Sequence, residues 1–395
     1  MKILVLAPHP FFLERGTPIA VRALIEVLAR AGHALDVLTY PEGLDVAIPG
    51  CTIHRVPSLP GLRNVPPGFS FRKLAYDVMM APMALARIAS RRYDVIHAVE
   101  ESAFMAATGC AWFGTPYVYD MDSSLPQQLE ERFPALQPVR RVMERCEAYA
   151  VRHSVAVVGM CRSVVDTALR YAPDLPASVI EDFSLLSPDD PPVESLRDEV
   201  GGPGPLVLYV GNLEPYQGID LLLDAVAHVR TRLGTARLVV LGGSPGTVAH
   251  YRERARSLGL GGLTHFLGPR PLASLGAYLH QADVLVSPRL TGHNTPMKVY
   301  SYLDAGRPLL ATRLATHTQV MDDETAMLAD PEPRAFGEAL VALLDDPGRG
   351  ARLAAAARER VRREYSREAF ARKVRAFYAD VERRLNERRA AGGAR

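Results

Sequence analysis

The stretch from Ser287 to Thr312, SPRLTGHNTPMKVYSYLDAGRPLLAT, decides the fold. It places a polar loop between a short apolar run, residues 284–286, and a predicted helix that begins near Pro296 and ends at Gly306. A second apolar run, which ends at Thr312, follows this helix. Strand, crossover helix and strand in this order are typical of a parallel sheet covered by helices.

The same alternation recurs on both sides of this stretch. Short apolar runs without strict alternation suit strands that are buried on both faces. The runs are KILVLAP, ALDVLTY, TIHRVP, DVIHAV, PYVYDMD, VAVVGM and ASVIED in the first half, and LVLYVG, RLVVLGG, LTHFLG, VLVSP, PLLAT and AMLAD in the second. We therefore predict an α/β fold of two doubly wound, Rossmann-like domains that face one another across a cleft.

Composition places the domain boundaries. Residues 184–205 are rich in proline, glycine and acidic residues and have little apolar periodicity, which favours a linker. We assign residues 1–187 to a first domain, 188–204 to the linker and 205–365 to a second domain. Residues 366–395 form a predicted terminal helix, which either covers the second sheet or crosses back to the first domain.

The totals exclude several classes of protein. The chain has 395 residues, 48% of them hydrophobic and 23% charged, which is typical of a globular protein. A formal net charge of +2 without a dense basic run argues against nucleic acid as a partner. The four cysteines lack CxxC spacing, so we expect neither a zinc site nor disulfides. No apolar run reaches 18 residues, and we expect a cytoplasmic protein.

Glycines follow three successive strands of the second domain. Gly211, Gly243 and Gly268 stand at these strand ends, and Arg270 comes two residues after the last of them. Glycines let a ligand lie against backbone N–H groups, although a single glycine at such a corner is usually only a turn. Three on one rim favour a ligand site.

The opening stretch adds charge to this rim. Arg289 and Lys298 are cationic, Asn294 and Thr295 supply hydrogen-bond donors, and the predicted helix directs its amino end at the loop. A helix dipole, backbone amides and a cation together make a site for a diphosphate. An ordinary capped loop remains the alternative.

Polar side chains also follow strands of the first domain. They are Gly16 and Thr17 before the first helix, His97, Glu100 and Glu101 after the fourth strand, and Asp120 and Asp122 at the fifth. Acidic residues at strand ends either face a wet cleft or cap the next helix, and both interpretations stay open. No GxGxxG follows the first strand, which argues against a dinucleotide dehydrogenase.

These motifs resemble a known family. The segments FLG from Phe266, ADVLVSP from Ala282 and NTPMKVYSYLDAGRPLLAT resemble the carboxyl-terminal domain of retaining glycosyltransferases of the GT-B fold, family 4 (group 1). ARAGHALDVLTY, from Ala29, resembles part of their acceptor domain. The resemblance implies a nucleotide-diphosphate sugar bound by the second domain, a sugar or lipid-linked acceptor bound by the first, and transfer without a cofactor or required metal.

The chain departs from the family at charged positions. Asn212 and Gln217 stand where the family usually has an arginine and a lysine that neutralise the diphosphate, and His293 and Ser301 stand where it has two glutamates. All four replacements are polar, and Lys298 remains. We therefore expect a divergent enzyme in which His293 is catalytic and the other residues bind the donor. A non-catalytic GT-B binding protein is the alternative, and a nucleotide-sugar epimerase is another.

The acceptor side lacks the histidine that the family often has at the end of the fifth strand. We expect Asp122 or Glu101 to orient the acceptor hydroxyl, with Asp120, Glu100 and His97 nearby. The Asp-x-Asp pattern resembles the metal-binding signature of another glycosyltransferase class, but three letters match easily by chance, and we expect no metal.

A Met-rich apolar helix is predicted between Phe69 and Tyr93, flanked by arginines and a lysine. Most helices of this kind belong to the core. The alternative is peripheral contact with anionic lipid at the inner face of the membrane, which would suit a lipid-linked acceptor.

Overall fold

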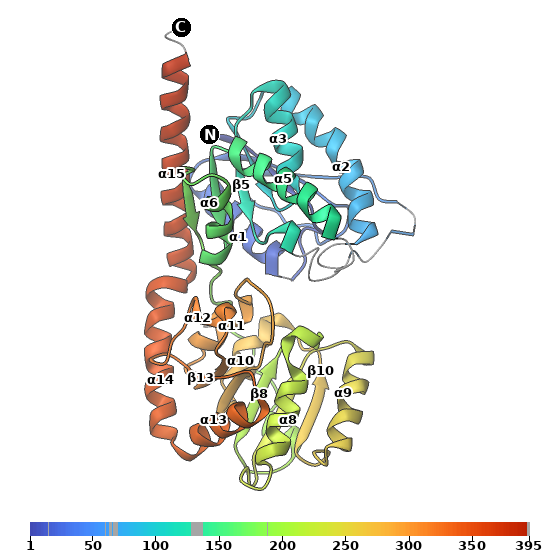
Figure 1. Ribbon diagram of the computed structural model, residues 1–395, viewed down its shortest axis with the longest axis vertical. Helices are drawn as coiled ribbons and strands as arrows, with labels where there is room; N and C mark the ends of the chain where they lie inside the picture. The colour runs from blue at the N-terminus through green and yellow to red at the C-terminus, as the bar shows by residue number, and fades with distance from the viewer. Residues whose placement is uncertain are drawn as a thin grey trace. The chain divides into compact units, whose positions relative to one another are not determined.

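The structure is a computed structural model that describes residues 1–14, 16–59, 61–62, 65, 70–127, 137–187 and 189–392. The chain forms two compact units (Figure 1). Unit 1 contains Met1–Glu181 together with Phe370–Arg395, and unit 2 contains Asp182–Ala369.

Unit 1 is built on a parallel sheet. Its described part has seven strands in the order β3-β2-β1-β4-β5-β6-β7. The strands are β1 (Lys2–Ala7), β2 (Ala34–Thr39), β3 (Cys51–Arg55), β4 (Val95–Val99), β5 (Tyr117–Met121), β6 (Ala156–Gly159) and β7 (Ala177–Val179). Val5 of β1 pairs with Val37 of β2 on one side and with His97 of β4 on the other. The strand order reverses between β1 and β4, where such sheets bind ligands.

Amphipathic helices cover this sheet. They are α1 (Gly16–Arg30), α2 (Phe71–Ala89), α3 (Ser102–Phe113), α5 (Gln137–His153) and α6 (Arg162–Tyr171). Helix α2 begins where the Ser70 side chain accepts a hydrogen bond from the Lys73 amide at 3.1 Å, which satisfies one of the free N–H groups of the first turn. Its residues at every fourth position, from Tyr76 through Met80 to Ile88, are buried in the core of unit 1.

The last helix of the chain, α15 (Arg367–Gly392), belongs largely to unit 1. Its buried side chains recur at helical spacing: Phe370, Val374, Phe377, Tyr378, Val381 and Leu385. The Tyr378 hydroxyl forms a 2.8 Å hydrogen bond with Nδ1 of His97, which is wholly buried in β4. Arg389 forms a 2.6 Å ion pair with Asp94, next to the start of the same strand. The carboxyl end of the chain is thus fixed to the centre of the first sheet.

Unit 2 repeats the architecture. In its described part, six parallel strands follow the order β10-β9-β8-β11-β12-β13. They are β8 (Leu206–Val210), β9 (Arg237–Leu241), β10 (Thr264–Gly268), β11 (Val284–Ser287), β12 (Leu309–Thr312) and β13 (Met327–Ala329). The order reverses between β8 and β11, so the predicted diphosphate loop after β11 lies at the reversal.

Helices accompany each strand of unit 2. The described ones are α7 (Leu196–Val200), α8 (Ile219–Val229), α9 (Pro245–Ser257), α10 (Leu275–Leu279), α11 (Met297–Asp304), α12 (Ala315–Thr318), α13 (Pro333–Asp345) and α14 (Pro347–Arg360). Short 3-10 turns precede α8 and α10, and a π-helical turn, Val361–Tyr365, follows α14. The two apolar clusters of unit 2 lie on opposite faces of its sheet, since alternate residues of β8, Val207 and Leu208, fall in different clusters.

The predicted fold class is confirmed, because each of the predicted apolar runs contains a strand of one of two doubly wound sheets. The predicted linker differs from the structure. Residues from Asp182 onward cluster with unit 2, and α7 lies inside the segment with Leu196 fully buried. The sequence did not predict this helix, because it is only about one turn long and lies in a proline-rich segment. No helix within the described ranges is long and apolar enough to cross a bilayer.

The contact between Tyr378 and His97 yields a stability prediction. We expect Tyr378→Phe to lower the free energy of unfolding by about 1–2 kcal/mol, because it leaves a buried ring nitrogen of His97 without its partner. Chemical denaturation followed by circular dichroism measures the change. Arg375→Ala, on an exposed position of the same helix, is the control and should leave the midpoint unchanged. An unaltered midpoint for Tyr378→Phe would contradict this role.

Candidate active site

Glycines bring two backbone segments together at the strand reversal of unit 2. Gly211 follows β8 with φ of 152°, and a Cβ atom there would lie 2.9 Å from Nζ of Lys298. Gly242 follows β9 with φ of 114°, and a Cβ atom there would collide with the Gly211 carbonyl oxygen. Only glycine suits both positions. The rim at the carboxyl ends of β8 and β9 is therefore bare backbone, as the sequence predicted for Gly211.

Lys298 is the central cation of this rim. Its Nζ donates a hydrogen bond of 3.1 Å to the side-chain oxygen of Gln217 and lies 4.0 Å from the centre of the Tyr209 ring. Among the described residues, no carboxylate forms an ion pair with it. Burial, with a further contribution from nearby Arg289, lowers the pKa of Lys298 well below its usual value. A cation in this environment is stabilised by an incoming anion.

Arg289 lies in the loop after β11. It is 8% exposed, its Nε donates to the Thr291 carbonyl at 2.8 Å, and its guanidinium lies 5.2 Å from the centre of the Tyr216 ring. One Nη also donates to the side-chain oxygen of Asn294 at 3.3 Å. These contacts fix the guanidinium in the loop. The structure therefore places Arg289, Asn294 and Lys298 in one loop-and-helix corner, as their spacing predicted.

Two further side chains complete the corner. Thr295 is 1% exposed, and its hydroxyl has no hydrogen-bond partner among the described residues. His317, which the sequence did not single out, is fully buried and bonded to the Ser287 hydroxyl at 2.9 Å and the Thr312 carbonyl at 2.8 Å. Burial lowers the pKa of His317 to about 4, so it is neutral near pH 7. The Thr312 hydroxyl donates to the Arg289 carbonyl at 2.6 Å, so this neutral network supports the cationic loop.

Other predicted donor residues have different surroundings. Ser301 is fully buried, and its hydroxyl accepts a 3.0 Å hydrogen bond from the Leu185 amide. Arg270 forms a 2.7 Å ion pair with Glu199 of α7. His293 is exposed, and its carbonyl accepts from the Gln319 side chain at 3.1 Å. The positions of Ser301 and Arg270 in the sequence predicted ligand contacts. Spacing alone does not show that each side chain also has a partner within the protein.

The remaining predicted donor residues line the same rim. Asn212 is within 3.4 Å of the Tyr216 hydroxyl, and its carbonyl accepts from the Tyr209 hydroxyl at 2.6 Å. Gly243 follows Gly242 with φ of 83°. Tyr209 and Tyr216 were missed by the sequence analysis, although their positions on each side of Gly211 placed them at the same strand end.

Unit 1 has a polar cluster at the carboxyl end of β4. Lys73 of α2 forms an ion pair with Glu100 at 3.1 Å, and its Nζ lies 2.7 Å from a carboxyl oxygen of Glu101. All three side chains are more than four-fifths buried. Glu100 has φ of 48°, a left-handed conformation that is rare outside glycine and directs its side chain toward the cluster. The sequence pattern indicates both glutamates, whereas it shows Lys73 only as a flank of the Met-rich helix.

The carboxyl groups of this cluster have divergent pKa values. Burial opposes ionisation of Glu100, but the adjacent Lys73 ammonium holds its pKa below the usual range. Burial, together with the charges of Glu100 and Asp77, raises the pKa of Glu101 to about 8. Burial also raises the pKa of Asp77 to about 6, although this carboxylate accepts a 2.6 Å hydrogen bond from Tyr40. Glu101 therefore keeps a proton near pH 7 while Glu100 is ionised.

His9, after β1, belongs to the same region. It is 8% exposed, and burial lowers its pKa to about 4, with Glu100 and Lys73 among the charges that act on it. Its Nδ1 lies 3.3 Å from the Pro10 carbonyl, and its Nε2 has no hydrogen-bond partner among the described residues. A buried, neutral imidazole with an unused ring nitrogen is available to a ligand.

His97 and Asp120, predicted as acceptor-side residues, form a buried pair. His97 Nε2 lies 2.9 Å from the Asp120 carboxylate, while its Nδ1 is bonded to Tyr378. His97 is therefore a structural link between β4, β5 and α15. Asp122 is half-buried at the end of β5. The loop after it is held by Glu147 of α5, which accepts from the Ser124 hydroxyl and the Leu125 amide, both at 2.9 Å.

Gly16 and Thr17 begin α1. Among the described residues, a Cβ atom at Gly16 would meet nothing within 4 Å. The first N–H groups of an α-helix lack partners within the helix, which favours an anion or a polar ligand at this end. No group of three potential metal ligands occurs among the described residues; that the protein needs no metal remains a prediction.

Comparisons with known proteins show the family of the chain. Residues 15–181 match the model of the "Glycosyl transferase 4-like domain", and residues 204–346 match that of the "Glycosyl transferases group 1". A D-inositol 3-phosphate glycosyltransferase of Xylanimonas cellulosilytica is 29% identical over 88% of each chain. A phosphatidyl-myo-inositol mannosyltransferase of Mycolicibacterium smegmatis is 27% identical over 92% of this chain and 90% of its own.

Solved structures share the fold. Sucrose-phosphate synthase from Thermosynechococcus elongatus superimposes with a TM-score of 0.77 at 22% identity, over 96% of this chain and 99% of its own. HepE from Anabaena, solved in complex with UDP, gives a TM-score of 0.73 at 17% identity, over 96% of this chain and all of its own. Together, the two family models, the two doubly wound sheets and the relatives that span the chain show that this protein belongs to the group 1 glycosyltransferases of the GT-B fold.

Proposed function

We propose that this protein transfers a sugar from a nucleotide-diphosphate sugar to an acceptor hydroxyl, with retention of anomeric configuration and without a required metal. In this reaction the bond from the anomeric carbon to the diphosphate oxygen breaks, and a bond from that carbon to the acceptor oxygen forms. The acceptor proton goes to the departing phosphate. The protein contributes by positioning both substrates and by stabilising the charge on the diphosphate.

One observation carries the proposal: the position of Lys298 next to Gln217. The family usually has a lysine at the place of Gln217, and here that place holds an amide whose oxygen lies 3.1 Å from Nζ of Lys298. The missing cation is thus replaced by another cation at the same corner. Without a carboxylate partner among the described residues, Lys298 is available to neutralise a diphosphate, with Arg289 as the second cation. Asn294 and Thr295 are the hydrogen-bond donors that we assign to the phosphate oxygens.

His293 remains our candidate beside the donor sugar. His293 stands at the position of the family's first glutamate. Its side chain is exposed, in the loop that precedes α11. The position of the second glutamate, Ser301, is already bonded to the Leu185 amide, so we propose that the ribose is held by other groups.

We assign the acceptor to the cluster of His9, Lys73, Glu100 and Glu101 in unit 1. An ionised Glu100 accepts a hydrogen bond from a sugar hydroxyl, and a protonated Glu101 donates one. The relatives are named for inositol phosphate and phosphatidyl-inositol acceptors. We therefore propose a sugar or a lipid-linked polyol as the acceptor and a place in glycan or glycolipid biosynthesis. Asp122 stays a candidate for orienting the acceptor hydroxyl.

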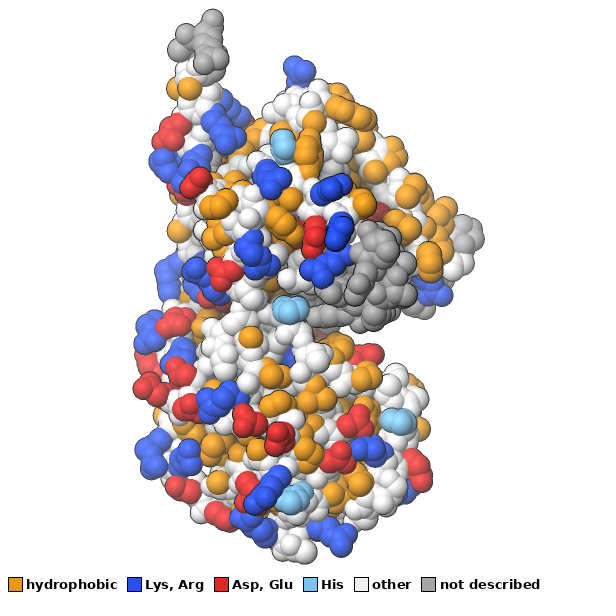
Figure 2. Space-filling model, in the orientation of Figure 1, with side chains coloured by type: hydrophobic (Ala, Val, Ile, Leu, Met, Phe, Trp, Pro, Cys, Tyr) orange, Lys and Arg blue, Asp and Glu red, His pale blue; other side chains and the backbone are white. Residues whose placement is uncertain are grey.

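A lipid-linked acceptor would require contact with a membrane surface, and α2 has a suitable face. Phe71, Leu74 and Val78 follow one another at helical spacing and are 84%, 46% and 67% exposed. Figure 2 shows hydrophobic side chains along the part of the surface formed by α2. Arg72 is exposed beside them. An apolar stripe with a neighbouring cation is the pattern of a helix that rests on anionic lipid.

The donor proposal predicts that Lys298→Ala weakens nucleotide-sugar binding by about tenfold or more, since one charge-assisted contact with the diphosphate is lost. Thermal shift with UDP-, GDP-, ADP- and TDP-sugars identifies the donor, and calorimetry then compares the variant with the parent. Lys373→Ala removes a lysine whose partner is Glu181, at 2.6 Å, and is the matched control. Equal affinity in Lys298→Ala and the parent would refute the phosphate assignment.

The same panel separates the alternatives. A glycosyltransferase releases nucleotide diphosphate only when an acceptor is present or, slowly, by hydrolysis. Conversion of the nucleotide sugar into its epimer without acceptor would indicate an epimerase. A protein that binds none of these compounds would be a non-catalytic member of the fold.

The raised pKa of Glu101 predicts how stability depends on pH. Because the folded state holds this proton up to about pH 8 and an unfolded glutamate releases it near its usual value of 4.5, the stabilisation is complete below about pH 4.5 and is lost as the pH rises through about 8. Glu101→Gln mimics the protonated acid. From pH 5 to pH 9, the parent should lose on the order of 1–3 kcal/mol of unfolding free energy relative to this variant. Urea denaturation measures the unfolding free energies. If the parent and Glu101→Gln differ by the same amount at pH 5 and at pH 9, the assignment is contradicted.

The α2 surface predicts binding to anionic vesicles. The parent should cosediment with vesicles that contain phosphatidylglycerol, less so at high salt, and Phe71→Ser together with Val78→Ser should weaken this binding about tenfold or more. Both side chains are exposed, so the fold should tolerate the change. Trp112→Ser removes an equally exposed apolar residue of α3 as a control. Binding that neither salt nor the α2 substitutions alter would exclude this surface.

A further inference from the structure

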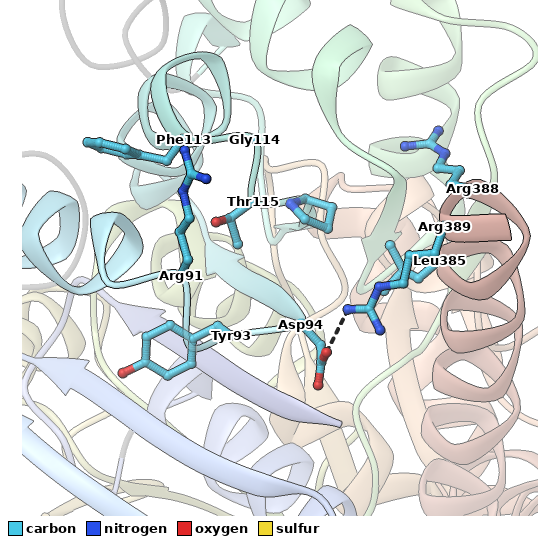
Figure 3. Close-up of a pocket in the computed structure, with 10 residues that line it drawn as sticks. Arg91, Tyr93, Asp94, Phe113, Gly114, Thr115, Leu385, Arg388 and Arg389 are labelled. Carbon is cyan, nitrogen blue, oxygen red and sulfur yellow. Dashed lines mark hydrogen bonds and ion pairs between the residues drawn. The ribbon is translucent and has the colours of Figure 1, made fainter. Parts of the chain in front are cut away.

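A pocket of about 390 Å³ lies in unit 1, and none of its lining residues belongs to the candidate acceptor cluster (Figure 3). It lies at the amino ends of β4 and β5, where Asp94 precedes Val95 and Pro116 precedes Tyr117. Helix α15 forms another wall through Leu385, Arg388 and Arg389. The candidate acceptor cluster is at the opposite, carboxyl ends of these strands. The pocket is therefore separate from the proposed site of transfer.

Three arginines and one carboxylate set the charge of this pocket. Arg389 is paired with Asp94 at 2.6 Å, which leaves Arg91 and Arg388 without an ion-pair partner among the described residues. Figure 3 shows Arg91 and Arg388 on opposite sides of Thr115. Like charges around one hollow are unfavourable unless water or an anion screens them. The pocket thus has an excess of positive charge and a hydroxyl between its two unpaired cations.

The backbone at Arg91 is unusual. Its φ is 50°, in the left-handed region that non-glycine residues rarely adopt, and its amide donates to the Ile88 carbonyl at 3.0 Å as the chain leaves α2. Glycine would suit this conformation better, so the turn itself gives no reason for an arginine. The Arg91 side chain is exposed and lines the pocket.

The other walls define the size and shape of a ligand. Phe113 and Tyr93 provide aromatic surface, and Leu385 adds an aliphatic side chain. A volume of about 390 Å³ is within the range of small-molecule sites, which combine apolar walls with a few polar groups. An inorganic ion alone would leave most of this space unfilled.

We propose that this pocket binds a small phosphorylated organic molecule, with the phosphate between Arg91, Arg388 and the Thr115 hydroxyl and the organic part against one of the two aromatic walls, Phe113. Planar guanidinium groups match the geometry of phosphate oxygens. The site is a second, non-catalytic one, since no group of the transfer cluster reaches it. Because α15 supplies one wall and β4 the other, a bound ligand would join the end of the chain to the sheet that carries the acceptor cluster.

The single tryptophan of the chain provides a local probe. Trp112 is 67% exposed, and its ring centre lies 6.3 Å from that of Phe113, a wall of the pocket. Trp112 belongs to unit 1, whereas Lys298 and Arg289, the residues that we assign to the donor diphosphate, belong to unit 2. The fluorescence of Trp112 therefore separates the pocket from the donor site, and failure of either proposal leaves the other testable.

The experiment titrates the full chain with phenyl phosphate, inorganic phosphate and benzyl alcohol in separate arms while Trp112 fluorescence is recorded. The test variant combines Arg91→Gly, which suits the left-handed backbone, with Arg388→Gln at an exposed position of α15. Arg375→Ala, an exposed arginine elsewhere on α15, is the matched control. Circular dichroism verifies that each variant is folded.

We expect a saturable fluorescence change with phenyl phosphate, weaker binding of inorganic phosphate and none of benzyl alcohol. The double variant should bind phenyl phosphate about tenfold or more weakly than the parent, while the control keeps the parent's affinity. A titration without saturation in the parent would overturn the proposal and leave the arginines a structural role only. Equal binding by the double variant, or binding of benzyl alcohol as tight as that of phenyl phosphate, would overturn it as well.

Discussion

Both candidate sites depend on one constraint, which is that every strand within each sheet runs parallel to its neighbours. Parallel strands end at a common edge, so residues far apart in the sequence meet there without any direct connection. In unit 1 this edge unites His9, Glu100 and Asp122, and in unit 2 it unites Gly211 and the loop that holds Arg289. The loops at these edges are free to vary because the helices, and not the loops, bury the apolar faces of each sheet.

The charge pattern of unit 2 shows how a site can change its residues and keep its electrostatics. Gln217 at the place of a cation would leave a diphosphate unneutralised if nothing else changed. Lys298 reaches that amide from α11, and the Tyr209 ring stabilises the ammonium through its π face. We propose that Lys298 supplies, at this corner, the positive charge that the family usually has at the position of Gln217.

The sequence predicted the fold almost completely, because an apolar run such as LVLYV has no stable place other than a buried strand. It also predicted the corner of Arg289, Asn294 and Lys298, where local spacing alone brings residues together. It failed where long-range contacts decide: Lys73 meets Glu100 across 27 residues, and Tyr378 meets His97 across 281. It did not predict the partners of Ser301 and Arg270, since no pattern reveals that a polar side chain is bonded to Leu185 or Glu199.

The contribution of α15 to unit 1 has a consequence for how the chain is made. Unit 1 combines the earliest residues with the last ones, whereas unit 2 is continuous from Asp182 to Ala369. During translation, unit 2 is therefore the first unit to have all of its residues outside the ribosome, although its synthesis starts second. The hydrogen bond between the Tyr378 hydroxyl and Nδ1 of His97 can form only after residue 378 has been synthesised. A premature stop near the carboxyl end would thus impair the half of the protein that was synthesised first.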